Sequence, residues 1–144
     1  MTQSEQPPDA LPSSVLPINV LIVDDHPLMR EALAAAFESE PDFVVCGTAA
    51  NGQEALVCLA RPWQQVDVVL SDVVMPRLGG IGLVKALRTD GVTTPVILMS
   101  GYAAHEARAV LKDAGVSAWL DKPPSSAALA EALAAALMRG ARPI

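Results

Sequence analysis

The stretch INVLIVDDHPLMREAL, residues 18–33, decides the fold class of this chain. Its first six residues are rich in Ile and Val and lack regular polar alternation, which is typical of a strand covered on both faces. Pro27 is well suited to the first position of a helix, and the residues around it predict a helix over 27–39. A buried strand that leads directly into a helix is the repeating unit of α/β folds.

The same unit recurs along the chain. Further strands are predicted over 43–48, 66–71, 95–99 and 117–120, and further helices over 51–60, 80–89, 103–114 and 125–138. Asn51 is a suitable N-cap for the second of these helices. Five strands that alternate with five helices predict a doubly wound α/β fold with one five-stranded parallel sheet.

The composition fits one ordinary domain. The chain has 144 residues, 51% of them hydrophobic, and no apolar run near the roughly 20 residues of a membrane-spanning helix. Residues 1–17 predict a disordered leader, residues 18–138 the folded domain, and residues 139–144 a C-terminal tail.

A net charge of −6, with no two basic residues adjacent, argues against direct binding of nucleic acid. No signal peptide is recognisable, so we expect a cytoplasmic protein in which Cys46 and Cys58 are buried free thiols.

Polar side chains gather at the carboxyl ends of the predicted strands. Ligands of open α/β sheets bind at these ends, near the point where the strand order reverses. The residues found there are Asp24-Asp25, Asp72, Ser100 and Asp121-Lys122. Each follows an apolar run directly, so the sequence predicts that these side chains converge at one edge of the sheet.

Such a set of side chains suits phosphoryl chemistry. Carboxylates packed together repel one another unless a cation lies between them, and Mg²⁺ prefers oxygen ligands of this kind. Asp72 can attack phosphorus to give an aspartyl phosphate, while Lys122 and Ser100 can contact the phosphoryl oxygens. The residues alone therefore predict a metal-assisted phosphoryl site.

Four motifs resemble the receiver domain of response regulators, the CheY-like family. They are VLIVDDHPLMREAL (20–33), DVVMPRLGGIGLVKALR (72–88), VILMSGY (96–102) and AGVSAWLDKP (114–123). The resemblance covers about residues 18–138 and implies the strand order 2-1-3-4-5. The first motif is most similar to receivers that carry a C-terminal helix-turn-helix domain.

This resemblance implies a role for each site residue. Asp72 would accept a phosphoryl group from the phosphohistidine of a sensor histidine kinase or a phosphotransfer protein. Asp25 would bind Mg²⁺ or Mn²⁺ directly together with Asp72, Asp24 would bind the metal through water, and the backbone carbonyl of Val74 would be a further ligand. Lys122 would contact the phosphoryl group, and the bond between Lys122 and Pro123 would be cis.

The resemblance also implies a switch and not an enzyme with turnover, because the domain would catalyse only its own phosphorylation and dephosphorylation. Ser100 and Trp119 would form the pair of residues that transmits phosphorylation. They would change the surface of the fourth helix, fifth strand and fifth helix, where a partner or a second copy of the chain would bind.

Other interpretations remain open for single residues. Asp24-Asp25 and Ser100 could cap helices, Lys122 could be a solvated charge, and His26 is expected to face solvent in a loop. In the predicted fifth helix, Leu129, Leu133 and Leu137 form a core stripe, whereas its alanine face could pack in the core or against a partner.

Two other protein classes are alternatives to a receiver. A phosphatase of the haloacid-dehalogenase type needs a second acid two residues after the nucleophile, where this chain has Val74. A flavin-binding, flavodoxin-like domain needs a neutral phosphate loop after the first strand, where this chain has acidic residues. Both classes are therefore disfavoured.

Overall fold

The computed structural model describes residues 17–101, 115–122 and 124–140, and its side-chain description ends at Leu137. These residues form a five-stranded parallel sheet with the order β2-β1-β3-β4-β5, as predicted. The strands are β1 Ile18–Val23, β2 Phe43–Ala49, β3 Val68–Asp72, β4 Val96–Ser100 and β5 Ala118–Asp121. The helices are α1 Pro27–Glu38, α2 Gly52–Ala60, α3 Gly80–Thr89 and α5 Ser126–Gly140. The helix predicted over 103–114 lies outside the described residues.

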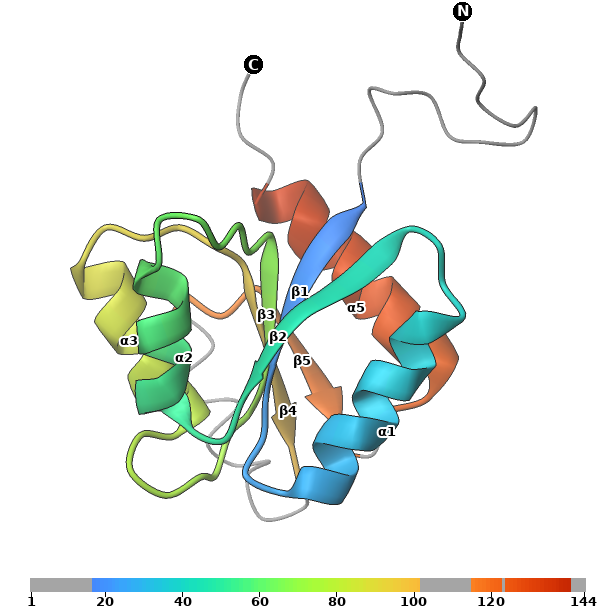
Figure 1. Ribbon diagram of the computed structural model, residues 1–144, viewed down its shortest axis with the longest axis horizontal. Coiled ribbons are helices and arrows are strands. Elements are labelled where there is room, and N and C mark those ends of the chain that lie inside the picture. The colour runs from blue at the N-terminus through green and yellow to red at the C-terminus, as the bar shows by residue number, and fades with distance from the viewer. Residues whose placement is uncertain (1–16, 102–114, 123, 141–144) are drawn as a thin grey trace, which may run out of the picture.

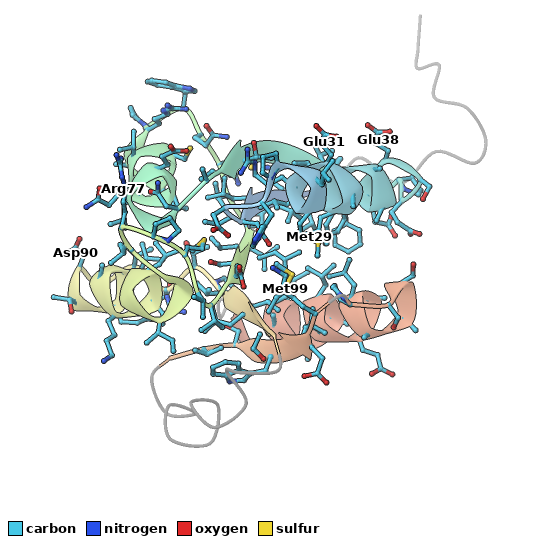
Figure 2. The ribbon with its side chains drawn as sticks, turned by 90° about the horizontal axis from the view of Figure 1, so that it is seen from below. Met29, Glu31, Glu38, Arg77, Asp90 and Met99 are labelled. Atoms are coloured by element: carbon cyan, nitrogen blue, oxygen red, sulfur yellow. The ribbon has the colours of Figure 1, made fainter. Side chains whose placement is uncertain are left out.

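Helices cover both faces of the sheet. Figure 1 shows α2 and α3 on one side and α1 with α5 on the other. Alternate residues of each strand point to opposite faces, so Leu21 packs with α2 and α3, and Ile22 packs with α1 and α5. Figure 2 shows Met29 and Met99 between α1 and α5, whereas Glu31 and Glu38 point away from the core. Two apolar layers thus bury every residue of β3 and β4 and the last four residues of β1, which explains their largely apolar sequence.

Most predicted boundaries agree with the structure to within two residues. The third strand begins at Val68 instead of residue 66, because Asp67 pairs with the backbone of Asn19 before β3 starts: its Oδ2 lies 2.8 Å from the Asn19 nitrogen. In α5, Ser125 is a cap and not a helical residue, since its hydroxyl accepts a hydrogen bond from the Ala128 amide at 3.0 Å. Asn51 caps α2 as predicted, and its side chain accepts from the amide of Glu54 at 2.9 Å.

The alanine face of α5 is divided between core and surface. Leu129 and Leu133 are buried as expected, but so are Ala132 and Ala136. The stripe that faces the sheet is therefore wider than the leucine spacing alone indicated.

The cysteines agree with the prediction in part. Both are free thiols, but only Cys58 is buried, whereas Cys46 is half-buried in β2, an edge strand of the sheet. Burial still raises the pKa of the Cys46 thiol, which keeps it protonated and unreactive at neutral pH. Among the described helices, none combines the length and apolar character needed to cross a bilayer.

Candidate phosphoryl and metal site

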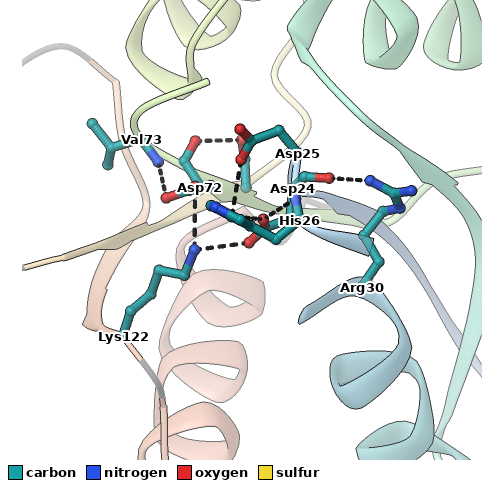
Figure 3. A network of polar contacts seen from close by, with 8 residues as sticks. Asp24, Asp25, His26, Arg30, Asp72, Val73 and Lys122 are labelled. Atoms are coloured by element: carbon teal, nitrogen blue, oxygen red, sulfur yellow. Dashed lines mark hydrogen bonds and ion pairs between the residues drawn. The ribbon is translucent and has the colours of Figure 1, made fainter. Parts of the chain in front are cut away.

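Three carboxylates meet at the carboxyl end of the sheet. Asp24 and Asp25 directly follow β1, and Asp72 is the last residue of β3, the strand beside it. Atoms of these three carboxylates and of the His26 ring all lie within 4.8 Å of one another. Asp24 is fully buried, Asp72 is 5% exposed, and Figure 3 shows their side chains together. The expected convergence of these residues is therefore confirmed.

Lys122 joins the group from β5. Its Nζ lies 3.0 Å from Asp24 Oδ2 and 3.2 Å from Asp72 Oδ2, and its side chain is 14% exposed. The amide of Lys122 also donates to the carbonyl of Ser100 at 3.0 Å, which places the lysine just beyond the end of β4. The solvated-charge interpretation of Lys122 is therefore wrong.

Backbone contacts fix the position of Asp72. Its Oδ1 accepts a hydrogen bond from the amide of Val73 at 2.9 Å. The loop that follows packs tightly, because a Cβ added at Gly80 would lie 2.4 Å from the Asp72 carbonyl oxygen. A Cβ at Gly79 would lie 2.5 Å from the carbonyl oxygen of Val73. The Gly79-Gly80 pair thus lets α3 begin directly against the backbone of Asp72.

Two buried oxygen atoms at this edge have no hydrogen-bond partner among the described residues. They are Oγ of Ser100, a residue only 1% exposed, and Oδ1 of Asp25, which has an ion-pair contact with the His26 ring at 3.1 Å but no hydrogen bond. Buried polar atoms are nearly always satisfied in folded proteins, so an orphaned pair calls for a ligand. The free carboxylate oxygen fits a hard divalent cation, and the free hydroxyl fits an anionic oxygen. The residues present therefore suit a Mg²⁺ ion.

For Asp72 and for Lys122, burial and the oppositely charged neighbours shift the pKa in opposite directions. Burial raises the pKa of Asp72, and the nearby charge of Asp24 raises it further, although Lys122 opposes both effects. Burial by itself would lower the pKa of Lys122, but its contacts with Asp24 and Asp72 outweigh burial, and the pKa is raised. The lysine is thus held in its charged form by the carboxylates that it partly neutralises.

Other predicted residues relate to this cluster in different ways. The side chain of Val74 is apolar and 70% exposed, so that position carries no acid and the phosphatase alternative gains no support. Trp119 is half-buried in β5 and packs against the apolar layer under α2 and α3. Asp121 is exposed and does not belong to the carboxylate cluster. Pro123 lies outside the described residues, and with it the predicted cis bond.

The contacts of two residues in this polar network were not predicted from the sequence. Arg30 of α1 donates from its guanidinium to the carbonyl of Asp24 at 2.6 Å. His26 was expected to face solvent, and its side chain is indeed 66% exposed, but its Nδ1 lies 3.1 Å from Asp24 Oδ1 and from Asp25 Oδ1. The one available signal was proximity in sequence, because both residues follow the acidic pair within six positions.

Comparisons with known proteins agree on one family. A family model of the response regulator receiver domain matches residues 20–134. The nitrate/nitrite response regulator protein NarP of Escherichia coli K12 is 36% identical over 119 residues, which are 83% of this chain and 54% of NarP. The sensor histidine kinase RcsC of the same strain is 35% identical over 127 residues, covering 84% of this chain and 13% of RcsC. The chain thus spans about half of one relative and a small part of the other.

Solved structures show the same fold. The receiver domain of the Francisella response regulator 1452 superposes with a TM-score of 0.73 at 30% identity, over 85% of this chain and 98% of that one. A response regulator receiver domain protein from Clostridium thermocellum gives a TM-score of 0.76 at 23% identity, over 85% of this chain and 95% of that one.

Proposed function

This chain belongs to the response regulator receiver family, and we propose that Asp72 is the residue through which it accepts a phosphoryl group. Receivers of this family are phosphoacceptor switches of two-component phosphorelay signalling. The observation that carries the proposal is the position of Lys122, whose Nζ contacts Asp72 and Asp24 together within 3.2 Å. This arrangement leaves one carboxylate at the end of β3 beside a fixed positive charge, as a phosphoacceptor requires.

The proposed reaction is a direct transfer between side chains. One carboxylate oxygen of Asp72 forms a bond to phosphorus, the bond from phosphorus to the donor imidazole breaks, and its electron pair remains on that nitrogen. The ammonium of Lys122 and the hydroxyl of Ser100 then contact the phosphoryl oxygens. The orphaned Ser100 hydroxyl supports this role, because it has no competing partner among the described residues.

The metal ligands are proposed as Asp25 and Asp72 directly, with the carbonyl of Val74. When bound, Mg²⁺ would neutralise charge on the carboxylates and on the phosphoryl oxygens. The contacts of Asp24 support a water-mediated role, because its Oδ2 pairs with Lys122 and its Oδ1 accepts from the His26 amide at 2.9 Å. Both oxygens of Asp24 are thus already engaged by the protein.

We further propose how the switch is transmitted. A phosphoryl group brings about −1.5 to −2 charges, so it would attract the Ser100 hydroxyl and leave space that the Trp119 ring can enter. The movement would alter the surface of β5, α5 and the helix predicted over 103–114, where a partner or a second copy of the chain would bind. The phosphoryl donor would be a sensor histidine kinase or a phosphotransfer protein.

The proposal is tested by phosphorylation with acetyl phosphate and Mg²⁺, followed by intact-mass measurement. We expect one acid-labile phosphoryl group on the wild-type chain and none on Asp72→Asn. Asp121→Asn is the matched control, because Asp121 also ends a strand of the sheet, β5, but is exposed, and the variant should be phosphorylated normally. Phosphorylation of Asp72→Asn at the wild-type rate would refute the assignment.

A further inference from the structure

His26 lies at the N-cap of α1, but its side chain does not cap the helix. It is the N-cap residue of α1, where Ser, Thr, Asp or Asn would satisfy a free amide, yet its side chain makes no capping hydrogen bond. Its Nδ1 lies instead 3.1 Å from an oxygen of Asp24 and 3.1 Å from an oxygen of Asp25 (Figure 3). The ring therefore belongs to the carboxylate cluster, and the needs of α1 do not explain its presence.

The spacing of these atoms is that of ligands around one metal ion. Neighbouring ligands of an octahedral ion, each about 2.1 Å from the metal, are separated by about 3.0 Å. Both contacts of the His26 nitrogen are 3.1 Å, which is close to that edge length. Apart from this 3.1 Å contact with His26, Oδ1 of Asp25 has no hydrogen-bond partner among the described residues, so a cation between the two atoms would meet no competing donor there. One ion can thus contact the nitrogen and Asp25 together.

The backbone holds His26 at this place without a metal. Its amide donates to Asp24 Oδ1 at 2.9 Å, and its carbonyl accepts from the amide of Arg30 at 3.0 Å. The Arg30 guanidinium also fixes the carbonyl of Asp24 at 2.6 Å. The backbone of His26 is therefore held beside the carboxylates by the start of α1, and one rotamer of its side chain brings Nδ1 to them.

We propose that His26 Nδ1 is a ligand of the cation at this site and makes the site favour first-row transition ions such as Mn²⁺, Co²⁺, Ni²⁺ or Zn²⁺ over Mg²⁺. The inference rests on the proposed metal site and adds a nitrogen to its oxygen ligands. Mg²⁺ takes oxygen ligands and retains water, whereas imidazole suits the transition ions. A nitrogen ligand thus adds affinity for the second class selectively.

The same geometry would arise if a protonated His26 neutralised the two carboxylates by hydrogen bonds. In that case the imidazolium would compete with any metal, and its removal would strengthen the binding of every divalent ion. The two alternatives therefore predict opposite effects of a His26 substitution.

The test is calorimetric titration of the apo protein with Mg²⁺ and with Ni²⁺. The chain has two histidines, so His105→Ala is the matched control for His26→Ala. We expect His26→Ala to weaken Ni²⁺ binding by at least on the order of 10- to 100-fold, because loss of a group that merely supports a metal ligand already has an effect of that size. Its Mg²⁺ affinity should stay nearly unchanged, and His105→Ala should behave as wild type for both ions.

A spectroscopic readout identifies the ligand directly. The electron spin-echo spectrum of bound Mn²⁺ should show coupling to an imidazole nitrogen in wild type and in His105→Ala, and none in His26→Ala. Unchanged or stronger Ni²⁺ binding by His26→Ala would overturn the role of His26 while leaving the metal site intact. Failure of the proposed site itself looks different, because Asp25→Ala would then bind Mg²⁺ as tightly as wild type.

Discussion

Two positively charged side chains, those of Lys122 and Arg88, are half-buried at opposite ends of the sheet, and they have different kinds of partners. Lys122 follows β5 at the carboxyl end and contacts two carboxylates within 3.2 Å. Arg88 lies in the last turn of α3 and reaches the segments that lead into β4 and β5, at the amino end. Its partners are backbone carbonyls: Val92 at 2.8 Å, Thr94 at 3.0 Å and Gly115 at 2.8 Å.

The pKa values of the two cations diverge for this reason. Burial lowers the pKa of Arg88, and its carbonyl partners carry no net charge to oppose that effect. Burial acts on Lys122 in the same direction, but the carboxylates of Asp24 and Asp72 outweigh it and raise the pKa. Carbonyl dipoles stay as they are, whereas carboxylates can be neutralised by a proton, a metal or a phosphoryl group. Arg88 is thus a permanent clamp, and Lys122 is a charge whose partners can change.

The largest expected effect comes from Lys122→Met. Breaking a buried ion pair on one side leaves uncompensated charge, which destabilises a fold by about 3–5 kcal/mol. Loss of a charge that stabilises the transition state should also slow phosphorylation by roughly 10²–10³-fold. Urea unfolding and the rate of labelling by acetyl phosphate measure the two effects separately.

Lys85→Met provides the control, because Lys85 is exposed on α3 and should change neither quantity. Wild-type phosphorylation kinetics in Lys122→Met would remove the distinction between the two cations.

Arg88→Met should affect stability alone. It leaves three carbonyl groups without their charged donor, and a hydrogen bond to a charged group contributes about 1.5–3 kcal/mol net, less where water can replace the lost donor, as at the exposed Gly115 carbonyl. We expect a loss of about 2–3 kcal/mol in the free energy of unfolding, with phosphorylation kinetics unchanged once the protein is folded. Arg88→Lys should recover only part of the loss, because an ammonium cannot reproduce the planar fork of donors. A phosphorylation defect as large as that of Lys122→Met would show that both cations serve the same site.

The difference between these cations also marks what the sequence could reveal. The convergence of Asp24, Asp72 and Lys122 was predictable, because parallel strands place their carboxyl ends at one edge and each residue follows an apolar run. The Arg88 clamp was not predictable, because backbone carbonyls leave no pattern in a sequence. An arginine near a helix end, three residues after Lys85, reads as a surface charge.

The same limit applies to His26 and to α5. Sequence placed His26 in an exposed loop, which its 66% exposed side chain agrees with, but the direction of a ring nitrogen depends on a rotamer that spacing does not encode. In α5, the leucine stripe was clear, whereas the burial of Ala132 and Ala136 depends on how closely the helix approaches the sheet. The sequence pattern thus predicted which residues lie close together, but the orientation of their side chains depends on the packing of the folded protein.

Magnesium should produce a moderate gain in stability. An ion bound only by the folded state contributes about 1.4 kcal/mol at roughly ten times its dissociation constant. The gain should be normal in Arg88→Met and absent in Asp25→Ala, and it should be larger in Lys122→Met, because there the ion replaces a missing positive charge. Thermal unfolding with and without Mg²⁺ measures each gain. An equal gain in Asp25→Ala and wild type would place the ion elsewhere.

The smallest effect concerns the pH dependence of Asp72, where burial and Lys122 act in opposite directions. Its pKa in the folded state is raised above the ordinary value of 3.8, chiefly by burial, so the folded protein keeps this proton to higher pH than the unfolded chain does. Stability from this group is therefore fully present below pH 3.8 and is lost as the pH rises through the raised pKa. Asp72→Asn cannot lose a proton, so its stability relative to wild type should increase from acid to neutral pH in metal-free buffer.

Urea unfolding of both proteins between acid and neutral pH measures this difference, and Arg88→Met should show the wild-type pH profile because its clamp contains no carboxylate. In Lys122→Met the loss with rising pH should steepen, since Asp72 and Asp24 then ionise side by side without a cation. A stability difference between Asp72→Asn and wild type that stays constant across this range would mean that Lys122 fully compensates the burial of Asp72.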